Sequence, residues 1–167
     1  MIYVGMGANL THPIFGEPVN TLLAALKAFE DRDLKVNRRS RWYKSAPVPI
    51  SDQPWFVNGV VEIETDLSAE DILIRLHEIE KEFGRVRDIK WEARVLDLDL
   101  VDCRGQVSEN QLQKNGGVYP HPHMHERSFV LLPLKDLDPN WKHPILKQGI
   151  DELLSGLDTQ LLQPMSE

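Results

Sequence analysis

The stretch WFVNGVVEIETDLSAEDILIRLHEIEKEFG, residues 55–84, indicates a β-strand followed directly by an α-helix. Over residues 55–65 the side chains alternate with the period of two that is typical of a strand. The apolar members of one face are Val57, Val61 and Ile63. Ser68 then suits a helix N-cap, and apolar side chains recur at helical spacing until Gly84, which can end the helix. The stretch therefore predicts a strand and an amphipathic helix that share one core.

The segments before this stretch repeat the same order of strand and helix. Residues 2–7 form a short apolar run that predicts a first strand. Pro18 suits the first position of a helix, whose apolar side chains recur as far as Phe29. Residues 34–44 predict a second strand. Residues 45–54 hold three prolines, which lack an amide donor, and therefore predict a loop.

The segments after residue 84 complete the fold. Residues 85–94 are polar and predict a loop, and residues 95–101 alternate again as a strand. Apolar spacing in residues 150–157 predicts a helix near the C-terminus. The order strand, helix, strand, strand, helix, strand predicts an α+β fold, a ferredoxin-like split βαβ sandwich with C-terminal helical additions.

Length and composition favour a single domain spanning residues 1–167 and exclude several classes of protein. The 41% hydrophobic and 27% charged residues are those of an ordinary globular chain, and no apolar run is long enough to span a membrane. The net charge of −7 disfavours nucleic acid as a partner. A single cysteine, Cys103, cannot form an internal disulfide and fits a reducing compartment. We expect a cytoplasmic monomer that acts on small molecules.

Asp97 and Asp99 are the first candidates for chemistry. Two residues apart on a strand, they project from the same face, opposite Leu96, Leu98 and Leu100. Carboxylates in this arrangement suit Mg²⁺, which is commonly bound by one or two of them together with substrate phosphates. The alternative is a solvent-facing edge of an amphipathic strand. The sequence predicts a magnesium site here because a basic segment precedes it.

That basic segment holds four cations within ten residues, namely Arg85, Arg87, Lys90 and Arg94. Arginine binds phosphate oxygens through two parallel hydrogen bonds and keeps its proton. Trp91, in the same segment, offers a flat surface for a heterocycle. The alternative is a solvated basic loop. The segment predicts a phosphate-binding site beside the carboxylates.

Phe56 and Asn58 share the other face of their strand, where a ring and an amide could bind a flat nitrogen heterocycle. Alternatively, Phe56 is a core residue and Asn58 is a polar group at a strand edge. His121 is a loop histidine that either contacts phosphate or is exposed. Glu80 stands one turn before Gly84, where the default interpretation is a surface acid of the helix.

Five groups of residues carry a resemblance to a known family. They are Gly7, Ala8, Asn9 and Leu10; Asp52, Gln53 and Pro54 with Phe56 and Asn58; Gly84, Arg85, Val86 and Arg87; Arg94 with Asp97, Leu98 and Asp99; and Pro120 and His121 with Arg127 and Phe129. In this order and spacing they resemble the 6-hydroxymethyl-7,8-dihydropterin pyrophosphokinase family of the folate pathway. The resemblance covers most of the chain.

The resemblance implies a role for each matching residue. It implies that Asp97 and Asp99 bind two Mg²⁺ ions. It implies that the catalytic residues are Arg85, Arg94, Asp97 and Asp99. For ATP it implies Glu80, Arg85, Arg87, Lys90, Trp91, Arg94, His121 and Arg127. For the pterin it implies Ser45, Val48, Phe56, Asn58, Trp91, Asp97 and Phe129, with the two phenylalanines on either side of the ring.

The implied reaction transfers the β,γ-diphosphate of ATP to the pterin hydroxymethyl group and releases AMP. Such transfer depends mainly on positioning and charge neutralisation, which fits a site rich in cations and carboxylates. Two alternatives share parts of this site: a metal-dependent nucleotidyltransferase, which would release pyrophosphate, and a nucleotide-binding regulator without catalytic activity.

Overall fold

The computed structural model of the chain describes residues 1–46, 52, 54–84, 95–109, 118–157 and 162–165. Its elements, in chain order, are β1 (Ile2–Ala8), α1 (Pro18–Glu30), β2 (Lys35–Arg39), β3 (Tyr43–Ser45), β4 (Phe56–Glu64), α2 (Ala69–Glu82), β5 (Asp97–Cys103), the short 3₁₀ helix η1 (Met124–Glu126), α3 (Ser128–Leu137), α4 (Ile150–Ser155) and β6 (Leu162–Pro164).

One antiparallel sheet forms the centre of the molecule. Its strands lie in the order β5-β1-β4-β3-β6, and β2 also pairs with β4. Between the two central strands, β1 and β4, the chain passes through α1, β2 and β3. This arrangement is the predicted ferredoxin-like split βαβ topology, and the α+β fold class is confirmed.

The predicted single strand over residues 34–44 is wrong in one respect, because the chain divides there into β2 and β3. Ser40 stands between them, and its Oγ accepts a hydrogen bond from the backbone N–H of Val60 at 2.9 Å. The Trp42 ring lies against Gly59, where an added Cβ would be 2.6 Å from ring atoms. The Ser40 N–H still donates to the Val60 carbonyl at 2.9 Å, but the Val60 N–H bonds to the Ser40 side chain instead of its backbone carbonyl, so regular pairing is interrupted at this point.

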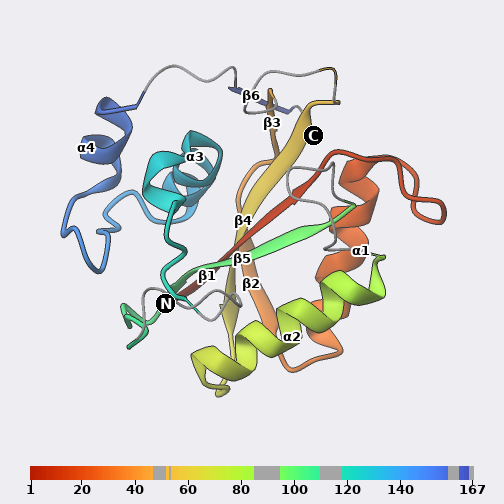
Figure 1. Cartoon of the computed structure of the whole chain (residues 1–167), viewed down its shortest axis with the longest axis horizontal. Helices are drawn as coiled ribbons and strands as arrows, with labels where there is room; N and C mark the ends of the chain where they lie inside the picture. The colour runs from red at the N-terminus through yellow and green to blue at the C-terminus, as the bar shows by residue number, and fades with distance from the viewer. Residues whose placement is uncertain (47–51, 53, 85–94, 110–117, 158–161, 166–167) are drawn as a thin grey trace.

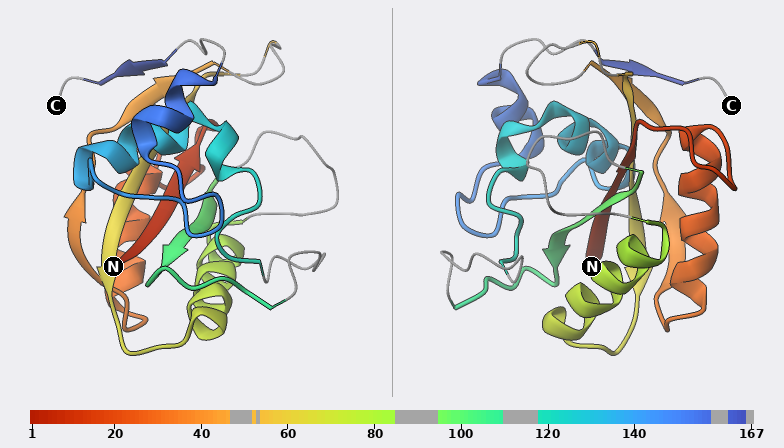
Figure 2. Two further views of the ribbon diagram at one scale, coloured as in Figure 1. Left: turned by 90° about the vertical axis from the view of Figure 1, so that its left-hand side faces the viewer. Right: turned by 45° about the vertical axis from the view of Figure 1, so that its right-hand side comes forward.

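Helices cover both faces of the sheet, as Figures 1 and 2 show: α1 and α2 lie on one face and α3 and α4 on the other. Each face has its own hydrophobic cluster. The first holds Val4, Met6, Leu22, Phe29, Val61, Ile72, Leu76 and Leu98; the second holds Tyr3, Val60, Val101, Leu131, Leu134 and Trp141. The face of β4 that carries Asn58, Val60 and Glu62 is therefore buried along much of its length.

The two predicted helix starts are confirmed. Pro18 is in the first turn of α1. At α2 the Ser68 Oγ accepts a hydrogen bond from the backbone N–H of Asp71 at 3.2 Å. Gly84 follows the end of α2 with a φ of +92°, a conformation that glycine adopts without steric cost. The capping residues thus fix where α2 ends, immediately before the predicted basic segment.

Helix α3 is a feature that the sequence did not predict. Its first turn is anchored by the Arg127 carbonyl, which accepts from the N–H groups of Val130 and Leu131 at 3.0 Å each. Pro133 lies inside the helix and is buried. Because proline has no N–H, Pro133 leaves one helical hydrogen bond unmade.

The predicted helix near the C-terminus is confirmed by α4. Among the residues described, no helix is both long and apolar enough to cross a membrane. The expected loop over residues 85–94 lies outside the described residues, as do residues 47–51 and 53 of the loop expected over 45–54.

Candidate functional site

Two glycines of β1 form the floor of the candidate site. In the sheet register Gly7 lies between Asn58 of β4 and Asp97 of β5, and Gly5 lies opposite Asp99. Side chains alternate along a strand, and Val4 of β1 faces the α1 and α2 side. Asn58, Asp97 and Asp99 therefore share the opposite face, with only glycine between them. The two glycines add no side chain to this face, and a Cβ added to Gly7 would meet the Asn58 amide oxygen.

Asp97 and Asp99 are both half-buried at the start of β5. Between them Leu98 points into the core, where it is 4% exposed, so the predicted alternation is confirmed. Among the described residues no group of three or more His, Cys, Asp or Glu side chains is arranged to hold a metal ion. Mg²⁺ is commonly bound by one or two carboxylates together with substrate phosphates and water.

Glu80 lies beneath this pair, so its interpretation as a surface acid is wrong. Its side chain is buried, with the residue 1% exposed, and Oε2 accepts a hydrogen bond from the backbone N–H of Leu98 at 2.9 Å. The bond connects α2 to the strand segment that carries both carboxylates. Helical spacing contained the signal: Glu80 is four residues after Leu76 and therefore on the apolar face of α2.

Asn58 is held in one orientation by Ser45. The Asn58 Nδ2 donates to the Ser45 Oγ at 2.6 Å, and both residues are buried, at 6% and 2% exposure. The Asn58 Oδ1 lies over Gly7, where an added Cβ would be 2.8 Å from it. The structure thus brings together Ser45 and Asn58, which sequence reasoning had linked only through the family resemblance.

Two half-buried aromatic rings flank this region of the sheet. Phe56 begins β4 two residues before Asn58 and shares its face. Phe129 is in the first turn of α3, which packs on β4. The Arg127 guanidinium carbon is 5.7 Å from the centroid of the Phe129 ring. The Phe129 ring and the Arg127 cation therefore lie within the range of a cation–π contact at the N-terminal end of α3.

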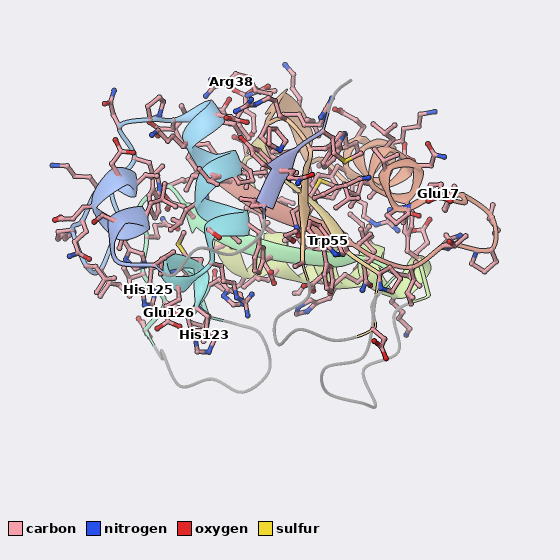
Figure 3. The ribbon with its side chains drawn as sticks, turned by 90° about the horizontal axis from the view of Figure 1, so that it is seen from above. Glu17, Arg38, Trp55, His123, His125 and Glu126 are labelled. Carbon is pink, nitrogen blue, oxygen red and sulfur yellow. The ribbon has the colours of Figure 1, made fainter. Side chains whose placement is uncertain are left out.

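His121 is neutral and close to the carboxylates. Burial, followed by the positive charge of Arg127, lowers its pKa to about 4. Its Nδ1 accepts a hydrogen bond from the backbone N–H of His123 at 3.1 Å, so the ring proton is on Nε2. Nε2 lies 3.8 Å from the Asp99 Oδ1. In Figure 3 His123, His125 and Glu126 are grouped beside the start of α3.

Asn9 is a residue of this region whose contact the sequence did not predict. Its Nδ2 donates to the backbone carbonyl of Pro54 at 3.2 Å, which connects the end of β1 to the approach to β4. The remaining predicted site residues, Val48, Arg85, Arg87, Lys90, Trp91 and Arg94, lie outside the described residues. The described part of the site thus comprises Ser45, Phe56, Asn58, Glu80, Asp97, Asp99, His121, Arg127 and Phe129.

Residues 3–139 match the sequence model of 7,8-dihydro-6-hydroxymethylpterin-pyrophosphokinase, abbreviated HPPK. The chain belongs to the HPPK family. The match takes in every residue of the site described above, from Gly5 to Phe129. The HPPK resemblance carried by the five sequence motifs is therefore confirmed.

Relatives of the chain bear the corresponding enzyme name. A 2-amino-4-hydroxy-6-hydroxymethyldihydropteridine pyrophosphokinase of Pseudomonas aeruginosa is 42% identical over 144 residues, covering 86% of this chain and 83% of the relative. The protein of the same name in Haemophilus influenzae is 39% identical, with 81% and 79% covered. The chain also matches 18% of the longer folic acid synthesis protein fol1 of Pneumocystis carinii, at 35% identity over 86% of its own length.

Solved structures support the HPPK fold. Wild-type HPPK-DHPS of Plasmodium falciparum, crystallised with SDX-DHP, superimposes with a TM-score of 0.65 at 15% identity. The superposition covers 92% of this chain and 43% of that one. At this identity the likeness shows the fold, which is the predicted α+β fold of an HPPK domain.

Proposed function

We propose that this protein transfers the β,γ-diphosphate of ATP to the hydroxymethyl group of 6-hydroxymethyl-7,8-dihydropterin, giving AMP and the pterin diphosphate for folate biosynthesis. One observation in the structure supports this beside the family membership. Carboxylates suited to metal-bound phosphates and an amide suited to a heterocycle stand on either side of Gly7, on one face of the sheet. The donor and acceptor of such a transfer could meet over that glycine.

We assign two Mg²⁺ ions to Asp97 and Asp99. The fit rests on the donor set: two carboxylates that project from one face of the sheet, opposite glycines that add no side chain there. Bound there, the ions would neutralise charge on the transferring diphosphate. The chain's own contribution is to fix the carboxylates, through the strand and through the Glu80 hydrogen bond to Leu98.

The ATP-binding residues in this proposal are Glu80, Arg85, Arg87, Lys90, Trp91, Arg94, His121 and Arg127. His121 would act as a neutral donor through Nε2, because its Nδ1 already accepts from the backbone. Arg127 would bring a permanent positive charge to the phosphates. The arginines of residues 85–94 would add bidentate contacts, and Arg85 and Arg94 would act on the transferring group.

The pterin-binding residues in this proposal are Ser45, Val48, Phe56, Asn58, Trp91, Asp97 and Phe129. The hydrogen bond from Asn58 to Ser45 leaves the Asn58 Oδ1 available to accept from an N–H of the heterocycle. Phe56 and Phe129 would stack on the two ring faces, and stacking favours offset contact between flat surfaces. Recognition of the ring would thus combine one fixed amide with aromatic surfaces.

The proposed step balances without a redox reagent. The hydroxymethyl oxygen forms a bond to the β-phosphorus of ATP while the bond from that phosphorus to the α,β-bridging oxygen breaks. AMP leaves with that oxygen, and the hydroxyl proton passes to solvent. The residues act by positioning and by charge, which is how most phosphoryl transfer is accelerated.

The direct test mixes the protein with ATP, Mg²⁺ and 6-hydroxymethyl-7,8-dihydropterin and resolves the nucleotide products, with pterin omitted as the control. Pterin-dependent AMP is the expected result. Pyrophosphate release would instead indicate a nucleotidyltransferase, ADP would indicate an ordinary kinase, and the absence of turnover would favour a nucleotide-binding regulator. Omitting Mg²⁺ and adding a chelator tests the metal requirement in the same assay.

We further propose that the enzyme works as a monomer in the cytoplasm. The single cysteine, Cys103, is buried, and burial raises the pKa of its thiol, so it suits a compartment where thiols stay reduced. A sedimentation experiment in the concentration range of the activity assay tests the monomer. A stable dimer there would overturn that part of the proposal.

A further inference from the structure

The C-terminal strand β6 pairs with the edge of the strand that carries Ser45. The register places Leu162 opposite Ser45, Gln163 opposite Lys44 and Pro164 opposite Tyr43. Beyond it, the Met165 N–H donates to the Trp42 carbonyl at 2.8 Å, and the Met165 side chain packs on the first hydrophobic cluster. This strand lies outside residues 3–139, which match the HPPK family model.

The position of Pro164 agrees with this register. Opposed residues of an antiparallel pair alternate between hydrogen-bonded and non-hydrogen-bonded pairs. Because Met165 and Trp42 form a hydrogen-bonded pair, Gln163 and Lys44 form the next one. Pro164, which has no N–H to donate, falls at the non-bonded position between them. β6 therefore holds β3 through the backbone of Gln163 and Met165.

Strand β3 is short and carries a functional hydrogen bond at its end. Its three residues pair on the other side with β4, and Tyr43 Oη donates to Asp136 of α3 at 2.9 Å. Ser45, the last residue of β3, accepts from the Asn58 amide. A shift of this short strand would thus move Ser45 away from Asn58 and release the amide.

We infer that β6 is a positioning element for the pterin site: by pairing with β3 it fixes Ser45, and through Ser45 it fixes the amide of Asn58. The inference rests on the proposed function for the identity of the ligand. It assigns a role in substrate recognition to a segment near the C-terminus that touches no reacting atom.

The test replaces Gln163 with proline. The following Pro164 already restricts residue 163 to extended conformations, so Gln163→Pro removes the backbone donor with little strain. Gln163→Ala is the matched control, because it keeps the N–H. We expect Gln163→Pro to raise the KM for the pterin about fivefold, the equivalent of one misaligned hydrogen bond, with the KM for ATP unchanged. Backbone hydrogen exchange in Tyr43–Ser45 should become faster in the same variant.

The outcomes separate this inference from the proposed function. An unchanged pterin KM in Gln163→Pro overturns the inference, and so does an equal rise in both KM values, which would indicate general damage. If the unaltered protein forms no pterin-dependent AMP, the proposed function fails. In that case equal exchange of β3 in Gln163→Pro and Gln163→Ala would overturn the positioning role by itself.

Discussion

Glu80 and Leu98 are joined by a hydrogen bond of 2.9 Å from the Leu98 backbone N–H to the Glu80 Oε2. Leu98 is the residue between Asp97 and Asp99, so a buried carboxylate of α2 fixes the backbone from which both carboxylates of the proposed metal site project. Glu80 is 1% exposed, and a buried N–H left without its acceptor costs free energy. We therefore propose that Glu80, besides the ATP-binding role proposed above, positions Asp97 and Asp99 through this bond.

Replacement of Glu80 should therefore weaken the response to Mg²⁺. We expect Glu80→Ala to raise the Mg²⁺ concentration for half-maximal activity about tenfold, because the loss of a group that orients metal ligands commonly weakens metal binding. Glu80→Gln keeps an acceptor for Leu98 and should recover most of the loss. Glu78→Ala, which removes an exposed acid of the same helix, is the control. Equal Mg²⁺ titrations for Glu80→Ala and Glu78→Ala would contradict this role.

Removal of one carboxylate of the pair should nearly abolish turnover. We expect Asp97→Ala to lower the rate of AMP formation by about 10³-fold, because charge stabilisation and positioning are lost together. Asp97 is only half-buried, so the thermal midpoint should change little. Glu64→Ala, at the exposed end of β4, serves as the control for lost negative charge. Near-normal turnover of Asp97→Ala would refute the metal assignment.

A methyl group on Gly7 should disturb the pterin side of the site. The added Cβ would be 2.8 Å from the Asn58 Oδ1, so the amide would have to move away from its bond with Ser45. We expect Gly7→Ala to raise the pterin KM about tenfold and to leave the fold intact. Gly149→Ala is the matched control, since its Cβ would meet nothing closer than 4.0 Å. Identical pterin KM values in the two variants would show that the Asn58 orientation does not matter.

Stability should fall in mild acid because of His143. Its Nδ1 accepts from the N–H groups of Ile145 and Leu146, both at 3.1 Å, and burial, followed by nearby His125, lowers its pKa to about 4. The unfolded chain takes up this proton near pH 6.5 and the folded chain near pH 4. The stability that the neutral ring provides is thus present above pH 6.5 and declines as the pH falls toward 4.

Urea unfolding at pH 7 and pH 5 measures this effect. His143→Asn keeps a side-chain acceptor that can reach an N–H two residues on, but it does not titrate. We expect the variant to lose less stability between the two pH values than the unaltered chain does. His121, whose pKa is lowered in the same direction, accounts for part of the remaining decline. Parallel losses in both proteins would show that His143 is not the sensitive group.

Local patterns in the sequence predicted much of the fold. The alternation of Val57, Val61 and Ile63 located β4, and Ser68 located the start of α2, because these signals depend only on neighbouring residues. The break between β2 and β3 depends on contacts of Ser40 with Val60, twenty residues away. A short continuous apolar run, such as the one within α3, does not distinguish a helix from a strand, and the three residues of β6 are too few to show a period.

The site was predictable to a similar extent. Spacing alone placed Asp97 and Asp99 on one face, and the structure confirms that alternation. Their placement beside Asn58 depends on the register of three strands, and the bond between Ser45 and Asn58 on the pairing of β3 with β4. Such register is decided by packing of the whole sheet, which a single sequence does not display. The roles of these residues in binding stay predictions.

Strand β6 has a consequence for solubility. An edge strand exposes a row of unpaired N–H and C=O groups, which can recruit strands of other molecules into aggregates. In the described part of the chain β6 is the outermost strand beyond β3, and its three residues include Pro164, which offers no donor. A short strand with a proline is a poor template for further pairing. β6 thus covers the edge of β3, and without β6 we expect β3 to become a site for self-association.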